Sequence, residues 1–315
     1  MSASSEARNR APKARVSAFK EIRRHYELYL FLLPTLLYYL IFHYGPMYGV
    51  QIAFRDYLGA LGIWGSPWVG LEHFKRFFNS TFFWPLLTNT VALSLLNLVF
   101  GFPVPVIFAL MLNQMRPGRY RKMVQTISYA PHFISTVVFV GIIFIFTSPS
   151  TGIVNILLDA LGGKRIYFMG SVPWFRPVYV ISDIWQETGW GAIIYLATLA
   201  GINPELYEAA TIDGASKLQR ILHIDIPGIL PTVTILLILR TGTIMSIGFE
   251  KAFLMQTPLN LDMSEIISTY VYKVGLVGAQ FSFGAAVGVF NSVVNLIMIA
   301  VVNRVASSLG ETSLW

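Results

Sequence analysis

Few side chains in this sequence have the types and spacing that a catalytic site needs. The sequence contains no cysteine, which excludes thiolate catalysis, disulfides and zinc–thiolate sites. The Gly163-Lys164 pair lacks the glycine spacing and the following Ser or Thr of a phosphate-binding loop. There is no H-E-x-x-H metal motif and no G-x-S-x-G nucleophile motif, and the five histidines are scattered. We therefore expect neither an enzyme nor a metal site.

Polar residues within long apolar runs are the remaining candidates for chemistry. Such residues are costly in a bilayer, and they usually face a partner side chain or a water-filled path. At about 1.5 Å per residue, Glu187 lies roughly 14 Å into the run 178–200 and Arg240 roughly 16 Å into the run 229–249. Two interpretations stay open: the two residues form a structural ion pair, or they line a path for a polar solute.

Three asparagines and a tryptophan belong to the same group. Asn97, Asn291 and Asn295 lie at similar depths, where an amide either bonds a neighbouring helix or faces a path. Trp185 lies beside Glu187 and would suit a sugar, which stacks its CH face on a ring, although packing is the commoner role of a buried tryptophan. The predicted path residues are Asn97, Trp185, Glu187, Arg240, Asn291 and Asn295.

The elements that must position these residues are membrane helices. Of the 315 residues, 55% are hydrophobic and 12% are charged, and the mean hydropathy is +0.60, so the chain belongs in a bilayer. A spanning helix needs about 20 apolar residues. The sequence predicts an all-α polytopic membrane protein with six transmembrane helices, at 26–44, 86–112, 124–147, 178–200, 229–249 and 283–303.

Positive charge predicts the orientation of these helices. The net charge is +7. Lys and Arg are densest before the first run and in the short segment 113–123, and two more lie in the segment 201–228, so the positive-inside rule places these three parts in the cytoplasm. We expect residues 1–25 to be a basic cytoplasmic tail, residues 26–315 to be a transmembrane domain, and both termini to be cytoplasmic. Membrane orientation explains the basic residues, so we do not expect nucleic acid as a partner.

The segment 201–228 is a polar stretch between two apolar runs. Asn203 is suited to cap a helix that begins at Pro204, and Gly214 is suited to end that helix because glycine adopts backbone angles that other residues avoid. A second short helix should follow and end at Pro227. We predict two short amphipathic helices at the membrane surface.

This segment resembles the EAA loop of the permeases of ABC importers. The matching residues are Glu208-Ala209-Ala210, Gly214, Ile224 and Pro227, with Ile226 where leucine is usual. The resemblance implies a cytoplasmic coupling helix that docks on a separate ATPase, and thus the type I fold of ABC importer permeases. The residues expected at the ATPase contact are Glu208, Ala209, Ala210, Asp213, Gly214 and Lys217.

The resemblance extends to most of the chain. The segments HYGPMYGVQIAFRDY (43–57), SPWVGLEHFKRFF (66–78), QTISYAPHFIS (125–135) and ISDIWQETGWGAIIYLA (181–197) are similar to the LplB- and YteP-type permeases of the class-one carbohydrate uptake family. This similarity implies oligosaccharide cargo, which can contain uronate. It also implies a bacterial cell membrane, a second homologous permease, cytoplasmic ATP-binding subunits that hold ATP and magnesium, and an extracellular sugar-binding lipoprotein.

Other classes of protein stay open on the sequence alone. A permease for peptides or amino acids would share the coupling loop. A secondary transporter would use an ion gradient and is expected to contain an inverted repeat, which the sequence does not display. A membrane scaffold or channel would have no need for the EAA spacing.

Overall fold

The computed structural model describes residues 25–308, and they are helical. Within those residues there is no strand, and Arg55 and Trp68 form an isolated β-bridge. The chain divides into two compact units, residues 1–51 and 52–315. Residues 1–24 of the predicted basic tail, together with residues 309–315, lie outside the described part of the chain.

The described part of the first unit is a long apolar helix. It consists of α2 (Tyr26–Tyr39), a π-helical segment (Leu40–Tyr44) and α3 (Gly45–Met47), and it continues into the 3-10 segment Tyr48–Phe54. Together these make a helix of 29 residues that is long and apolar enough to cross a membrane. The predicted first span is therefore helical and is longer than its predicted range 26–44.

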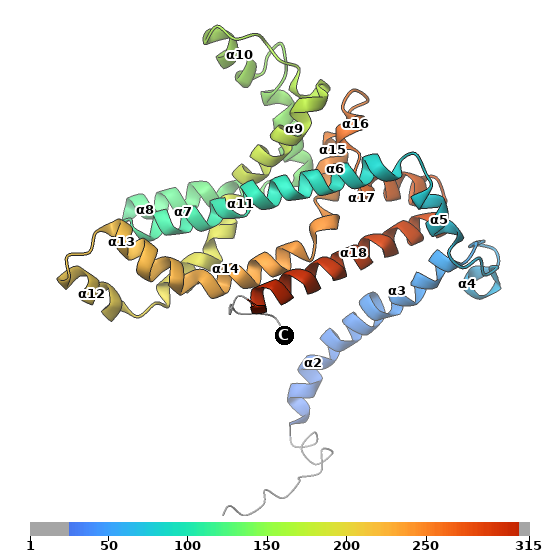
Figure 1. The fold of residues 1–315 in the computed structure, drawn as a ribbon, viewed down its shortest axis with the longest axis horizontal. Helices are drawn as coiled ribbons and strands as arrows, with labels where there is room; N and C mark the ends of the chain where they lie inside the picture. The colour runs from blue at the N-terminus through green and yellow to red at the C-terminus, as the bar shows by residue number, and fades with distance from the viewer. Residues whose placement is uncertain (1–24, 309–315) are drawn as a thin grey trace, which may run out of the picture. The chain divides into compact units, whose positions relative to one another are not determined.

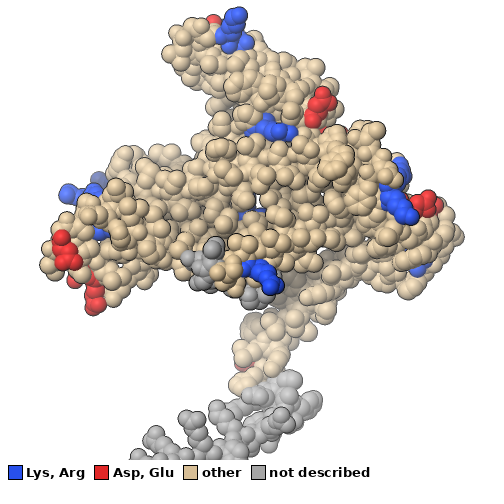
Figure 2. Space-filling model, viewed as in Figure 1, with Lys and Arg blue, Asp and Glu red and all other residues tan. Residues whose placement is uncertain are grey.

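The second unit is built from the remaining helices (Figure 1). Their bounds are α4 (Gly62–Gly65), α5 (Glu72–Phe78), α6 (Phe83–Leu96), α7 (Pro103–Asn113), α8 (Arg119–Tyr129), α9 (Thr136–Phe146), α10 (Ile153–Ala160), α11 (Phe175–Ala200), α12 (Pro204–Ile212), α13 (Lys217–Arg220), α14 (Ile226–Thr241), α15 (Phe249–Met255), α16 (Leu261–Ser264), α17 (Ile267–Tyr270) and α18 (Phe281–Ser308). Charged side chains are sparse on the face shown in Figure 2, and acidic ones gather at the end that carries α12.

Helix α11 lies at the centre of this unit. Its residues belong to two buried apolar clusters: Phe175 and Tyr179 pack with α6, α9 and α15, whereas Ala192 and Leu199 pack with α7 and α14. It also approaches α8 closely, since a Cβ at Gly189 would lie 2.1 Å from the Ser128 carbonyl oxygen. A third cluster joins α5, α6, α17 and α18. Side chains on α11 can therefore reach several spans at once.

The predicted third span, 124–147, is wrong as a single helix. Helices α8 and α9 are bent by 102° at a short break between them. The 3-10 segment Ala130–Phe133, which contains Pro131, ends the first helix, and proline cannot donate the backbone hydrogen bond that a continuous helix requires. The break itself lies at Ile134 and Ser135, whose backbone is extended. The apolar composition of the run concealed this bend.

The second short helix of the coupling loop was also predicted wrongly. It does not end at Pro227: α13, the π-helical segment Ile221–Asp225 and α14 form one helix of 25 residues, Lys217–Thr241. Pro227 lies in the first turn of α14, directly after the π-helical segment, so the regular hydrogen-bond pattern of the helix is already interrupted where the proline N–H is missing. The fifth span accordingly ends at Thr241 and not at residue 249.

Among residues 25–308, length and composition identify four helices that could cross a membrane, or five if α8 and α9 count as one broken span. The remaining predicted span corresponds to α11, which has 26 residues. Asp183, Gln186 and Glu187 make α11 more polar than the other spans, and these are the side chains that build the site described next.

Candidate functional site

A cavity of about 640 Å³ opens against α11 in the middle of the second unit. Its walls come from α6, α7, α11, α14 and the segment between α14 and α15. Of the predicted path residues, Asn97, Glu187 and Arg240 line it, and Asp183 lines it as well. The structure thus brings together three of the six residues that were predicted to line a path.

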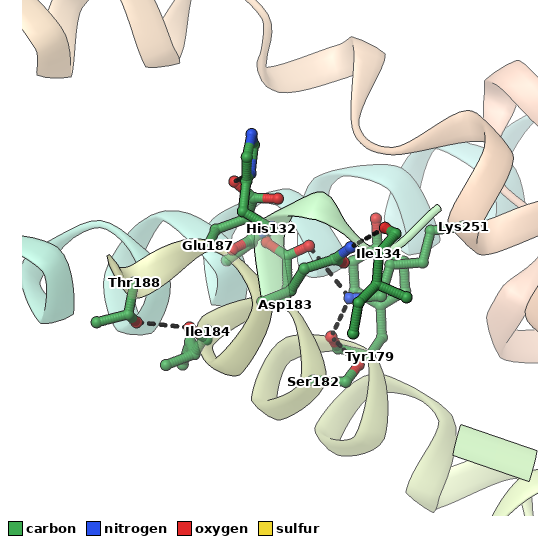
Figure 3. Close-up of polar contacts among 11 residues, drawn as sticks. His132, Ile134, Tyr179, Ser182, Asp183, Ile184, Glu187, Thr188 and Lys251 are labelled. Carbon is green, nitrogen blue, oxygen red and sulfur yellow. Dashed lines mark hydrogen bonds and ion pairs between the residues drawn. The ribbon is translucent and has the colours of Figure 1, made fainter. Parts of the chain in front are cut away.

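Asp183 forms a buried ion pair in the wall of this cavity. Its Oδ1 accepts from Lys251 Nζ at 3.1 Å, and its Oδ2 accepts from Asn97 Nδ2 at 2.9 Å. Lys251 also donates to the Tyr179 carbonyl oxygen and lies over the rings of Phe139 and Tyr179. The side chains of Lys251 and Asp183 are only 6% and 18% exposed. Figure 3 shows the ammonium group of Lys251 directed at α11.

Glu187 lies one helical turn after Asp183 and contacts a different partner. His132 Nδ1 is 3.0 Å from Glu187 Oε2, and the His132 ring stacks on Trp190 at 4.4 Å between centroids. Gln186 Nε2 donates to the Ile134 carbonyl oxygen. Residues of α11 therefore hold the 3-10 segment at the bend between α8 and α9 (Figure 3).

Arg240 is the cation of the cavity wall that has no acidic partner. It lies in the last turn of α14 and is exposed. The ion pairs found among residues 25–308 do not include Arg240. Of the two interpretations that the sequence left open, the geometry favours the path over a Glu187–Arg240 pair.

The other three predicted path residues do not line the cavity. Trp185 stacks on Phe139, with ring centroids 5.6 Å apart. Asn291 and Asn295 donate to Ser246 Oγ at 3.4 and 3.0 Å, and Asn295 Oδ1 accepts from the Met245 N–H. These asparagines hold the segment after α14 against α18, which is the interhelical role that the sequence left open for them.

Sequence reasoning missed Asp183, His132 and Lys251. Asp183 could have been found from its spacing, because residues four apart share a helix face and Glu187 was already a candidate. Lys251 could not have been found, since it lies just after the predicted fifth span, 229–249, and thus outside the apolar runs that were searched for polar residues. His132 lies in a predicted continuous span, so nothing indicated the turn that presents it to α11.

The predicted coupling loop folds as an exposed helical elbow. Asn203 Oδ1 accepts from the Glu205 N–H at 3.1 Å and caps α12 as predicted. Gly214 follows α12 with φ of +74°, a conformation that favours glycine. Five of the six predicted contact residues are exposed, and Ala210 is half-buried. Exposed apolar side chains accompany them: Leu206, Ile212 and Leu218. Such a surface suits contact with another protein.

A buried carboxylate lies under this elbow. Asp225 is 0% exposed and accepts from Tyr207 Oη at 2.5 Å, Gln114 Nε2 at 2.7 Å and Asn113 Nδ2 at 3.4 Å. Burial, together with the hydrogen bond to Asp225 and its negative charge, raises the pKa of Tyr207 to about 12. Tyr207 is thus a neutral donor at physiological pH. A second cavity, of about 460 Å³, borders Tyr207, Asn113 and Gln114.

Comparison with known proteins identifies the family. Residues 101–307 match the model of the binding-protein-dependent transport system inner membrane component. The chain is 45% identical to Protein LplB of Bacillus subtilis (strain 168) over 95% of this chain and 94% of that protein. It is also 45% identical to the polygalacturonan/rhamnogalacturonan transport system permease protein YteP of the same organism, over 94% and 92% of the two chains.

Solved structures agree with these relatives. A chain of a bacterial alginate ABC transporter, in complex with an alginate pentasaccharide-bound periplasmic protein, superposes with a TM-score of 0.86 at 43% identity. The match covers 94% of this chain and 99% of that chain. A structure of a bacterial ABC transporter involved in the import of the acidic polysaccharide alginate gives a TM-score of 0.85 at 44% identity, over 92% and 98%.

The type I permease fold, the membrane location and the function as a transport subunit without enzymatic activity are thereby confirmed, and the secondary-transporter and scaffold alternatives fall away. The chain belongs to the family of inner membrane components of binding-protein-dependent transport systems.

Proposed function

We propose that this chain is one of two permease subunits of an ATP-driven bacterial importer whose cargo is an acidic oligosaccharide. The observation that carries the proposal is the distribution of charge in the 640 Å³ cavity. Lys251 neutralises Asp183 and His132 faces Glu187, whereas Arg240 has no acidic partner. A guanidinium group binds a carboxylate through two parallel hydrogen bonds, so Arg240 is available to the carboxylate of a uronate sugar.

The names of the relatives support acidic cargo. One transports polygalacturonan and rhamnogalacturonan, and another takes part in the import of the acidic polysaccharide alginate. Peptides or amino acids, the alternative cargo for a permease with this coupling loop, have no counterpart among these names. The polar wall of the cavity offers hydroxyl-binding groups besides Arg240, including Asn97, Thr188 and Thr243.

The mechanism that fits these parts is alternating access. Cytoplasmic ATPase subunits, which hold ATP and magnesium, close on ATP and draw the α12 elbows of two homologous permeases together. The spanning helices respond by opening the cavity outward, where an extracellular sugar-binding lipoprotein delivers the cargo. Hydrolysis then returns the cavity to the inside. This scheme requires six spans per chain, cytoplasmic termini and a cytoplasmic α12.

Uptake by the whole transporter with Arg240→Gln or Arg240→Lys tests the role of Arg240. Glutamine removes the charge and keeps a hydrogen-bonding head group, and lysine keeps the charge. With Arg240→Gln we expect the rate of uptake of uronate oligosaccharides to fall at least tenfold and that of neutral oligosaccharides of the same length to change less than twofold. Arg240→Lys should keep more of the uptake of uronate oligosaccharides than Arg240→Gln but less than the unchanged transporter, because an ammonium group keeps the charge and cannot form the two parallel hydrogen bonds. An equal loss for both cargoes with Arg240→Gln contradicts the proposal.

A further inference from the structure

The elbow that carries α12 has few attachments to the spanning helices. No residue of α12 is buried, and Tyr207 and Thr211 form its side-chain hydrogen bonds to other helices of the described chain. The Thr211 bond is long, at 3.4 Å, and goes to Arg220 of the neighbouring α13. Tyr207 Oη, in contrast, reaches Asp225 at 2.5 Å. The Tyr207 hydroxyl is thus the short polar link between α12 and the membrane domain.

Asp225 connects α12 to the ends of two spanning helices through hydrogen bonds. It closes the π-helical segment that precedes α14, and π-helical segments frequently mark functional positions in helices. Its two carboxylate oxygens accept hydrogen bonds from three residues: Tyr207 of α12, Asn113 at the end of α7, and Gln114, which directly follows α7. One side chain therefore connects the elbow to two spans that contribute to the cavity wall.

The link is costly to break because of where the carboxylate lies. Asp225 is fully buried, and the ion pairs formed by residues 25–308 do not involve it. A buried carboxylate without a cation depends on its hydrogen-bond donors. If α12 moved away from the spans, Asp225 would lose its shortest donor. The raised pKa of Tyr207 keeps that donor protonated at physiological pH.

We propose that the Tyr207–Asp225 hydrogen bond transmits the movement of α12 to α7 and α14, so that Tyr207 is a positioning residue for energy coupling. The inference rests on the proposed function, in which α12 contacts the ATPase. Glu208 and its exposed neighbours receive the movement, and Tyr207 on the inner side of the same helix passes it to the spans.

The test uses the assembled transporter in proteoliposomes with its ATPase subunits and binding protein. Tyr207→Phe removes a single hydroxyl and keeps the ring, and Tyr120→Phe, at a tyrosine that is 67% exposed on α8, is the matched control. We expect Tyr207→Phe to retain its ATPase subunits and to hydrolyse ATP, while cargo transported per ATP falls about tenfold. Tyr120→Phe should leave this ratio unchanged. An unchanged ratio in Tyr207→Phe overturns the proposal.

A second variant separates coupling from simple loss of structure. Because the natural chain has no cysteine, Tyr207→Cys with Asp225→Cys places thiols at the two ends of the link and nowhere else in this subunit. A bis-methanethiosulfonate reagent of tyrosine length, which forms a disulfide with each thiol and releases methanesulfinate, should restore transport per ATP. A reductant that cleaves these disulfides should abolish it again. Failure of the bridge to restore the ratio, or loss of bound ATPase subunits from Tyr207→Phe, shows a structural role and overturns the proposal.

The proposed contact with the ATPase is tested separately. A single cysteine in place of Glu208, labelled with a thiol-reactive photo-cross-linker, should cross-link to the ATPase subunit in the assembled complex upon illumination. Absence of that cross-link refutes the docking of α12, whatever Tyr207→Phe does. A cross-link at Glu208 combined with normal coupling in Tyr207→Phe refutes only the transmission through Asp225.

Discussion

The buried charged residues of this chain have ion-pair or hydrogen-bond partners because an unpaired charge is costly to bury. Lys251 and Asp183 illustrate this, since both are mostly buried and each satisfies the other. Lys251→Met should destabilise the folded protein by about 3–5 kcal/mol, because removal of one partner leaves a buried charge uncompensated. The double variant Asp183→Asn with Lys251→Met removes both charges and should recover most of this loss. Thermal unfolding of the purified protein in detergent measures both. Equal melting temperatures of the single and double variants would contradict the role of the pair.

The residue scale is also where sequence reasoning was least complete. Glu187 and Arg240 were identified as candidates because charge in an apolar run is conspicuous. His132, the partner of Glu187, and the Asp183–Lys251 pair were not identified, because His132 and Lys251 come from segments whose three-dimensional position depends on breaks in the helices. Trp185 was predicted to line the path because Glu187 lies two residues later in the sequence. Residues two apart on a helix point in different directions, and the Trp185 ring packs on Phe139 instead.

Elements pack closely where glycine permits it. A Cβ on Gly284 of α18 would lie 2.7 Å from the Cα of Gly275, whereas a Cβ on Gly288, one turn later, meets nothing within 4 Å. Gly284→Ala should therefore destabilise the protein by about 1–3 kcal/mol through overpacking, and Gly288→Ala should change stability by less than about 0.5 kcal/mol. Melting temperatures of the two variants, side by side, measure the difference. Similar melting temperatures would show that α18 can shift to accept the extra methyl group.

The sequence predicted which segments are helical better than it predicted where each helix begins, bends and ends. The cap at Asn203 and the stop at Gly214 rest on local backbone chemistry, and both were correct. The bend before α9 and the continuity of α13 with α14 depend on how proline is placed within a helix turn, which the residue type alone does not determine. The same proline chemistry that was expected to end a helix at Pro227 is accommodated there at the start of α14.

The whole molecule is expected to work only as part of a larger assembly, so the decisive measurement concerns its exposed elbow. Glu208→Lys reverses a charge at the proposed ATPase contact. We expect it to leave insertion in the membrane unchanged and to reduce transport more than tenfold, with loss of bound ATPase subunits or of their response to cargo. Glu205→Lys, on the first turn of the same exposed helix, is the matched control and should have a much smaller effect. Normal transport by Glu208→Lys would refute the assignment of the elbow.

The continuous helix Lys217–Thr241 connects the exposed elbow directly to the wall of the cavity. It begins beside the exposed elbow and has Arg240 in its last turn, so its two ends are about 35 Å apart at 1.5 Å per residue. A tilt of about 10° at its base would carry the guanidinium sideways by about 6 Å over that length. In the proposed mechanism, a small movement of the elbow by the ATPase would therefore be enough to move the proposed cargo-binding cation from one side of the cavity to the other.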